Sequence, residues 1–464
     1  MREYYDRFRL YVRRPEGFFV VVTAVFGVLF ALLIPPFQTP DEDLHLYRAY
    51  EVAELKVPQT IQDGRTGSYL PASIAKTRDF VNAGNGQNRF LGNQKYDIRT
   101  TKGALLDIPL NRSDTTFYNT SSSPAYFPLM YAPQAIVVAI ANLFQSPVIV
   151  TLYLVRLAIL SIWIFAGYVA IRLMKWRQWT LAGVCVLPFA LAQSVSPGLD
   201  VLTHGAALLY LVLIARVVTG SLALKKSTIA LLVSLSVLMI FGKSTMAVFF
   251  LLLLLVPRRY LRYKYPLLIK LGMIAIPVVA YFIWLFVSRG WEVPGDTSQM
   301  QSFLGNPLDF LLVLANSLFL TSPSGLVLHQ SLIGNFGWLD TPVSPFVIAS
   351  GYVLVGVVLL ANYEKMKPIF SDRIRNAYFG AAAVYCLGVF LAMYLYVTPV
   401  DSLVVVGVQG RYFFPLVIIA VIALCRPPLV AKKRTYVRLI TYGTAALLFA
   451  SVATIILRYY VSAA

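Results

Sequence analysis

The stretch GFFVVVTAVFGVLFALLIPPFQTPDEDLHLYRAYE, residues 17–51, places three consecutive carboxylates immediately after a long apolar run. The run is about as long as an α-helix must be to cross a bilayer. Two prolines end it, Pro40 suits the first position of a second helix, and Thr39 suits the cap of that helix. The stretch therefore predicts a first membrane span that leads directly into an acidic helix at one membrane face.

The composition of the whole chain agrees with a membrane location. The 464 residues are 58% hydrophobic and only 13% charged, and the mean hydropathy is +0.69. The apolar runs are continuous rather than alternating, which favours helices over a barrel. The fold class expected for residues 1–464 is therefore an all-α polytopic membrane protein with a single transmembrane domain.

The net charge of +19 is better explained by basic loops than by nucleic-acid binding. Five arginines, at positions 2, 7, 9, 13 and 14, precede the first run and predict a cytoplasmic N-terminus. Later basic clusters occur at 172–177, 225–226, 258–264, 365–375 and 426–434. They stay on the same side if the spans are 17–35, 148–171, 179–195, 200–218, 227–241, 244–256, 266–288, 345–361, 378–397, 403–425 and 437–457.

This topology leaves two extracytoplasmic loops, 37–126 and 289–344, and two apolar segments that do not fit as spans. Segments 127–144 and 303–320 are expected to be interfacial or re-entrant helices on the outer side. The spans 227–241 and 244–256 are short for a bilayer. They are expected to form a hairpin whose tip is Gly242-Lys243-Ser244.

The acidic helix carries the first candidate site. Asp41, His45 and Arg48 follow an i, i+4, i+7 pattern and share one helix face. A carboxylate near a helix start and an imidazole is a plausible general base, so Asp41 and its neighbour Glu42 are the candidate catalytic residues. The alternative is that these acids only stabilise the start of the helix.

Three cations in or beside apolar runs are candidate ligands of a phosphate: Arg156, Lys243 and Arg411. A charged side chain in a span usually faces the interior and a partner, and arginine can hold a phosphate with two hydrogen bonds. A structural ion pair is the alternative for Arg156. The other candidate substrate-binding residues are His45, Arg48, Asp200, Trp338, Asp340, Gln409 and Tyr412, although a helix cap explains Asp200 and an interfacial belt explains Trp338 equally well.

The sequence lacks the motifs of metalloproteases, of Cys/His metal sites and of serine hydrolases. The sequence contains no HExxH, no Cys/His metal set and no GxSxG, so no metal ligands are predicted. The three cysteines, Cys185, Cys386 and Cys425, lie in or at the end of apolar runs and read as small core residues.

Three motifs carry a family resemblance: PDEDLHLYRAYE at 40–51, GNFGWLDTP at 334–342 and GVQGRYFFPL at 407–416. A first span followed by the first motif resembles the start of GT-C glycosyltransferases, the membrane enzymes that use polyprenyl-phosphate sugars. The fuller pattern is similar to a bacterial membrane-protein family of unknown function, number 2142 in its series. Asp43 departs from the pattern, in which a proline or small residue is expected.

The resemblance implies a GT-C-like bundle of about 11–13 transmembrane helices, with interfacial helices in the long first outer loop. It implies an inverting transfer of sugar from undecaprenyl phosphate to a cell-surface polysaccharide or glycolipid, outside the bacterial cytoplasmic membrane. Asp41 would be the catalytic base, and a divalent metal, Mg or Mn, stays open as a cofactor. The alternatives are a flippase for lipid-linked saccharides and a noncatalytic partner in polysaccharide assembly.

Overall fold

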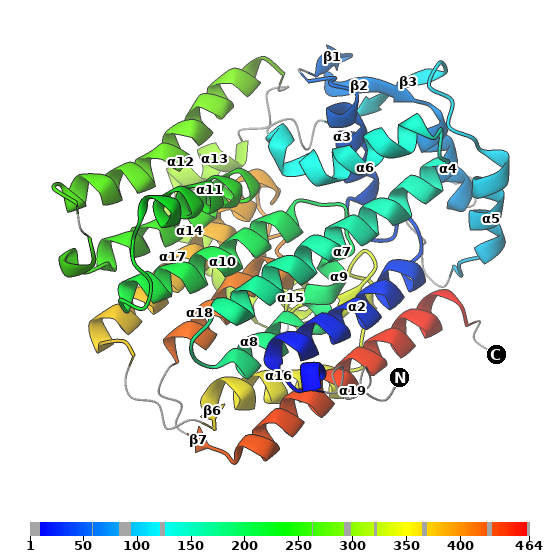
Figure 1. Cartoon of the computed structure of the whole chain (residues 1–464). Coiled ribbons are helices and arrows are strands. Elements are labelled where there is room, and N and C mark those ends of the chain that lie inside the picture. The colour runs from blue at the N-terminus through cyan, green and yellow to red at the C-terminus, as the bar shows by residue number, and fades with distance from the viewer. Residues whose placement is uncertain are drawn as a thin grey trace.

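The computed structural model describes residues 10–57, 59–82, 94–120, 126–261, 263–291, 298–319, 323–363, 369–424 and 429–461. Arg2, Arg7, Arg9, Cys425 and parts of the basic clusters at 258–264, 365–375 and 426–434 lie outside these residues. The described chain is mostly helical (Figure 1). Its centre is formed by α2 (Pro15–Leu33), α7 (Val148–Leu173) and α10 (Asp200–Val218), with α7 packed against both of the others.

Six helices among the described residues are long and apolar enough to cross a membrane. They are α2, α7 and α10, followed by α12 (Pro266–Ser288), α17 (Asp372–Tyr396) and α19 (Lys433–Tyr459). Each coincides with a span expected from the sequence. The all-α polytopic fold class is therefore confirmed, while the side of the membrane that each end faces stays a prediction.

Two expected spans are wrong as single helices. Segment 179–195 is divided into α8 (Gln178–Cys185) and α9 (Pro188–Gln193), because the ring of Pro188 cannot continue the preceding helix. Segment 403–425 is regular only from Gly410, where the short 3₁₀ helix η5 (Gly410–Phe413) leads into α18 (Phe414–Ala423). The expected span 345–361 is present as a single shorter apolar helix, α16 (Pro345–Leu360), which packs against α19.

The expected hairpin around Lys243 is present, but one arm is a 3₁₀ helix. Helix α11 (Lys226–Gly242) and the 3₁₀ helix η2 (Ser244–Leu255) pack against each other, and Lys243 lies between them. A 3₁₀ helix rises about 2.0 Å per residue, so the 12 residues of η2 extend roughly 24 Å. This length nearly matches the roughly 26 Å of the 17-residue α11. The tighter helix thus lets a short segment run back along its partner.

The two leftover apolar segments form short helices. Segment 127–144 contains the 3₁₀ helix η1 (Pro128–Tyr131) and α6 (Ala132–Leu143), which packs on α7 and on the acidic helix α3 (Glu42–Ala53). Segment 303–320 contains α14 (Pro307–Leu318). At 12 residues each, α6 and α14 are about 18 Å long, too short to cross a bilayer core of about 30 Å. The remaining helices of the second expected outer loop are η4 (Arg289–Trp291), α13 (Ser298–Gly305) and α15 (Pro323–Ser331).

The first expected outer loop also contains strands that the sequence analysis did not predict. An antiparallel sheet has the order β1 (Thr60–Gln62), β2 (Arg65–Pro71), β3 (Thr115–Asn119), with Thr60 opposite Gly67 and Tyr69 opposite Phe117. The turn from β1 to β2 is Asp63-Gly64, and both residues have positive φ, as a tight hairpin requires. Helices α4 (Ser73–Val81) and α5 (Ile98–Asp107) complete this part. The smaller elements elsewhere are η3 (Arg258–Tyr260) and the strand pairs β4 (Asn335–Phe336) with β5 (Thr341–Pro342) and β6 (Ala361–Asn362) with β7 (Leu429–Val430).

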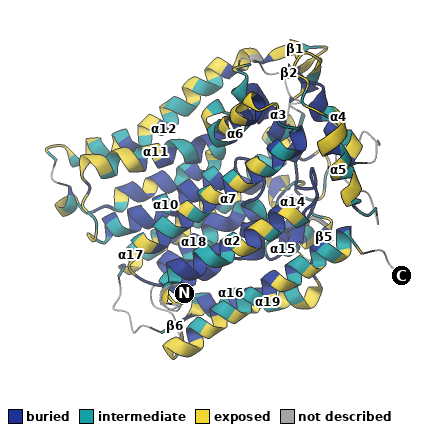
Figure 2. Ribbon diagram, turned by 45° about the vertical axis from the view of Figure 1, so that its right-hand side comes forward, coloured by how far each residue is buried: buried dark blue, intermediate teal, exposed yellow. Residues whose placement is uncertain are grey.

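Apolar side chains cover much of the outside of the bundle. Helix α12 is an example, since Ile276, Phe282 and Phe286 are all more than half exposed, and exposed residues recur along its length (Figure 2). Helix α10, by contrast, is almost entirely buried. An exposed face of this kind suits contact with lipid rather than water.

Arg156 connects the first span to the acidic helix. It lies inside α7 with no exposed surface, and its five N–H groups all have acceptors. Nε and Nη2 donate to the two carboxylate oxygens of Glu42, each at 2.7 Å. The other three bonds go to the backbone carbonyls of Ala31, Ile34 and Pro35, at the end of α2. The carbonyl of Ala31, in the last turn of α2, is one of those that a helix end leaves without an intrahelical partner.

We expect Arg156→Gln to destabilise the protein by about 3–5 kcal/mol, because it leaves the carboxylate of Glu42 buried without a counter-ion. The measurement is the thermal or denaturant unfolding of the purified chain in detergent. Adding Glu42→Gln to this variant is expected to restore part of the loss, because the uncompensated charge is then removed.

The matched control is Arg172→Gln on the same helix, since Arg172 is exposed and its only described hydrogen bond is with Tyr168. It is expected to change stability by no more than about 0.5 kcal/mol. Equal losses in the two single variants would contradict the anchoring role of Arg156.

Candidate functional site

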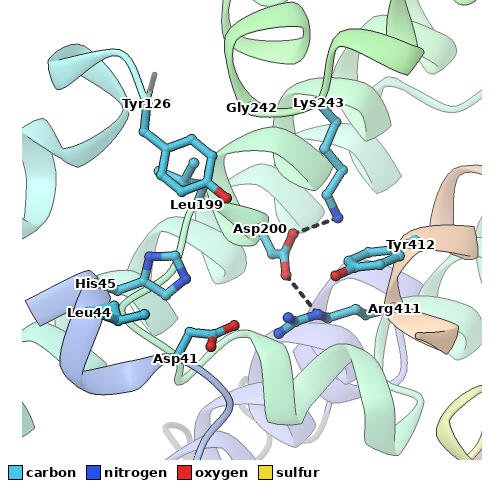
Figure 3. A pocket seen from close by; sticks show the side chains of 10 residues that line it. All are labelled: Asp41, Leu44, His45, Tyr126, Leu199, Asp200, Gly242, Lys243, Arg411 and Tyr412. Carbon is cyan, nitrogen blue, oxygen red and sulfur yellow. Dashed lines mark ion pairs between the residues drawn. The ribbon is translucent and has the colours of Figure 1, made fainter. Parts of the chain in front are cut away.

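A cavity of about 210 Å³ lies where α3, α10 and the tip of the α11–η2 hairpin meet the start of η5. We call it the Asp41 cavity. Figure 3 shows its lining side chains directed inward from these separate elements. The lining residues are Asp41, Leu44, His45, Tyr126, Leu199, Asp200, Gly242, Lys243, Arg411 and Tyr412.

Asp41 occupies the position before the first residue of α3. The helix begins at Glu42, two residues later than Pro40 suggested, and the expected cap by the Thr39 side chain is wrong. Asp41 has left-handed backbone angles, φ 60° and ψ 20°, which an aspartate tolerates better than most residues. Its carboxylate caps no backbone N–H and makes no hydrogen bond or ion pair with the described residues. A half-buried carboxylate is thus left facing the cavity.

The opposite wall holds two cations around one carboxylate. Lys243 Nζ lies 2.7 Å from Asp200 Oδ1, and Arg411 Nε lies 3.3 Å from Asp200 Oδ2 (Figure 3). Asp200 is the first residue of α10, and the Pro197-Gly198 turn directs the chain into that helix. The two cations therefore share a single counter-ion, with Asp41 as the second acid of the cavity.

The two cations keep unused hydrogen-bonding capacity. Lys243 Nζ and Arg411 Nε are buried and lie within ion-pair distance of Asp200, but a lysine has three N–H donors and an arginine has five, so this one carboxylate uses only part of their capacity. Arg411 Nη1 donates to Gln193 Oε1 at 3.2 Å. Buried donors without acceptors cost free energy, so an anion entering the cavity would find donors available to it.

The backbone next to Arg411 packs tightly against the end of α15. Gly410 N donates to Ser331 Oγ at 2.8 Å. A Cβ at position 410 would lie 2.4 Å from the backbone nitrogen of Leu332, so only glycine fits there. Tyr412 then places its ring 4.0 Å from Lys243 Nζ, a favourable cation–π distance. The GVQGRYFFPL motif thus sets both the guanidinium and the aromatic surface of one wall.

His45 lies on the Asp41 side of the cavity. Its Nδ1 shares a hydrogen bond of 2.7 Å with the hydroxyl of Tyr131. Burial lowers the pKa of His45 to about 4, although the nearby Asp41 carboxylate opposes this shift. His45 is therefore neutral at pH 7 and adds no positive charge to the cavity.

Six of the residues proposed from the sequence line this cavity: Asp41, His45, Asp200, Lys243, Arg411 and Tyr412. Glu42 and Arg156 do not, because they are fully buried in their own ion pair. This corrects the sequence-based roles of Glu42 as a catalytic group and of Arg156 as a phosphate ligand. Arg156 has no donor left for a ligand.

The other four proposed residues also lie outside the lining. Arg48 is buried in an ion pair with Glu51 at 2.8 Å and also bonds the carbonyl of Tyr126. Trp338 Nε1 donates to the carbonyl of Phe37, and Asp340 pairs with Arg458 at 3.3 Å. Gln409 precedes the 3₁₀ helix that carries Arg411 and does not line the cavity.

The sequence analysis missed supporting residues that contact the site. Tyr126 lines the cavity, Gln193 holds Arg411, and Tyr131 holds His45. Tyr126 and Tyr131 flank Pro128, the first residue of η1. Two tyrosines at the end of a long loop were the sequence feature that could have indicated a role in the site. Gln193 had only the short QSVSPGLD segment to mark it.

The acidic and imidazole side chains that line the cavity do not suit the binding of a divalent metal ion. Asp200 is already paired with Lys243 and Arg411. Among the described residues, no group of three or more His, Cys, Asp or Glu side chains could hold a metal ion. The charged groups available to a ligand are thus the two cations of one wall and the Asp41 carboxylate of the other.

The comparison with protein families identifies one match. A family model with the description "Predicted membrane protein (DUF2142)" matches residues 24–420, which is most of the chain and contains every residue that lines the Asp41 cavity. No curated protein matches the chain. The chain therefore belongs to this family of membrane proteins, the one that its three motifs resemble.

Proposed function

We propose that this protein is a membrane glycosyltransferase that moves a sugar from a polyprenyl-phosphate donor to a hydroxyl of a cell-surface polysaccharide or glycolipid. The reaction takes place in the Asp41 cavity. By the distribution of basic residues in the sequence, this cavity lies on the outer side of a bacterial cytoplasmic membrane.

One observation carries the proposal. Asp41, a carboxylate with no hydrogen-bond or ion-pair partner among the described residues, faces a wall in which Asp200 uses only part of the donor capacity of Lys243 and Arg411. A base and an anion-binding wall on opposite sides of one small cavity are what transfer from a phosphate leaving group requires.

The chemistry follows from these positions. The Asp41 carboxylate takes the proton of the acceptor hydroxyl as its oxygen forms a bond to the anomeric carbon. The bond between that carbon and the donor phosphate oxygen breaks, and its electron pair stays on the phosphate. Arg411 and Lys243 offset the charge that develops there. A single displacement inverts the anomeric carbon.

The size of the cavity limits what it can enclose. Its volume of about 210 Å³ is below the roughly 300–1,000 Å³ of sites that enclose drug-sized ligands. A sugar phosphate head group is of this scale, whereas a polyprenyl chain is not. The lipid tail would therefore lie outside, against the apolar surface of the bundle.

We expect Asp41→Asn to abolish glycosyl transfer while undecaprenyl phosphate still binds. Loss of a general base lowers the rate by about 10²–10⁴-fold, but the cations of the opposite wall are unchanged. The measurements are the surface glycans of a deletion strain carrying the variant, and the affinity of the purified chain for undecaprenyl phosphate. The strain should lack one sugar residue, and the dissociation constant should stay within about threefold of wild type.

The matched control for this variant is Asp107→Asn, an exposed carboxylate at the end of α5 in the same loop. It should restore the glycan. If Asp41→Asn also restores it, Asp41 is not the base, and a flippase that uses only the cations explains the site better.

Arg411→Gln is expected to weaken binding of undecaprenyl phosphate by about 10- to 150-fold, the equivalent of one lost charge-assisted hydrogen bond of about 1.5–3 kcal/mol. Binding of the lipid by the purified chain is the measurement. Arg289→Gln, which removes an exposed cation after the end of α12, is the control and should bind normally. Unchanged affinity in Arg411→Gln would show that the phosphate is held elsewhere.

A further inference from the structure

A second charged cavity lies at the other end of the bundle. It has a volume of about 560 Å³ and is lined by the starts of α2, α8 and α19. Helix α2 begins at this cavity and ends close to the Asp41 cavity. Because α2 has 19 residues, the two cavities are separated by about 28 Å along its axis. We call the second one the basic cavity; it is lined by Arg13, Arg14, Pro15, Gln178, Trp179, Tyr363, Lys433, Arg434 and Val437.

Four cations line the basic cavity and no carboxylate does. Arg13, Arg14, Lys433 and Arg434 make no ion pair with any described residue. Lys433 Nζ instead lies 5.3 Å from the centre of the Tyr363 ring. Two segments that are more than 400 residues apart in the sequence thus bring four like charges to one hollow.

The helix ends add to this positive potential. Pro15, Gln178 and Lys433 are the first residues of their helices, and a helix start carries a partial positive charge and free N–H groups. Cations placed there repel the helix dipole and each other. The nearest acid of these first turns, Glu16, is buried in α2 and does not line the cavity. The four cations and the helix starts together give this hollow a positive potential, which attracts an anion.

The surroundings indicate that this anion belongs to a lipid. The cavity is at the ends of two candidate spans, α2 and α19, and these helices pack together, with Phe26 against Phe449. Val25 on α2 and Tyr442 and Phe449 on α19 are all more than half exposed. Acyl chains can lie against this apolar surface while a head group enters the hollow at the membrane–water boundary.

We propose that the basic cavity binds the phosphate head group of an anionic phospholipid. The binding is independent of the reaction proposed for the Asp41 cavity. Four cations suit more than one phosphate, so a phospholipid with two phosphates binds more tightly than one with a single phosphate, and a zwitterionic phospholipid binds weakly.

Native mass spectrometry of the full chain in detergent tests this proposal, with cardiolipin, phosphatidylglycerol, phosphatidylcholine and inorganic phosphate added separately. The double variants Lys433→Gln/Arg434→Gln and Arg13→Gln/Arg14→Gln each remove two charges. Each should lower cardiolipin affinity by about 30-fold. Both pairs are exposed, and the unchanged melting temperature of either variant shows that it is folded.

The control variant Lys175→Gln/Arg373→Gln removes two exposed charges that do not line this cavity, and it should bind cardiolipin as wild type does. If the control and the cavity variants lose the same cardiolipin affinity, the effect is one of general surface charge, and the proposed site is wrong. Equal binding of phosphatidylcholine and cardiolipin would also overturn it. Inorganic phosphate that binds as tightly as cardiolipin would overturn the assignment to a lipid.

Discussion

The position of the Asp41 cavity depends on the buried guanidinium of Arg156. A charge in a membrane span is tolerated only when its partners are complete, and here the five donors of Arg156 are all used. Three hold the carbonyls at the end of the first span, and two hold Glu42 in the first turn of α3. The short connection between these elements is thereby held at both ends. Asp41, which lies within it, adopts a left-handed conformation that leaves its carboxylate free of the helix it precedes.

The same principle gives the acids of residues 41–43 three different roles. Glu42 neutralises a buried cation. Asp43 lies 3.5 Å from Arg78 of α4 and so ties α3 to the rest of the loop. Asp41 is the one of the three that faces the cavity. Glu42 and Asp43 therefore stabilise the structure, whereas Asp41 is the candidate catalytic group. Adjacent residues of like charge thus have different roles.

Cations are divided in a similar way between structure and binding. Arg177 is fully buried, and it donates to backbone carbonyls at the ends of α16 and α18, much as Arg156 does at the end of α2. Lys243 and Arg411 differ because they share one carboxylate in the lining of a cavity, so part of their donor capacity stays available to a ligand. The cations of the basic cavity have no carboxylate partner among the described residues. Arg156 and Arg177 thus hold helix ends through several backbone carbonyls, whereas Lys243 and Arg411 line a cavity that a ligand can enter.

The sequence by itself determined the membrane class, the six long apolar helices and the hairpin tip at Lys243, and it named six of the residues that line the Asp41 cavity. Long continuous apolar runs can form only a few structures, and charges isolated within them are conspicuous. The sequence did not distinguish Arg156 from Arg411, predict the sheet of the first loop, or separate α8 from α9. Only the tertiary structure decided these points. Glu42 and Arg156 are 114 residues apart, and the pairing of two charges over such a separation depends on how the helices pack, which no local pattern of residues records.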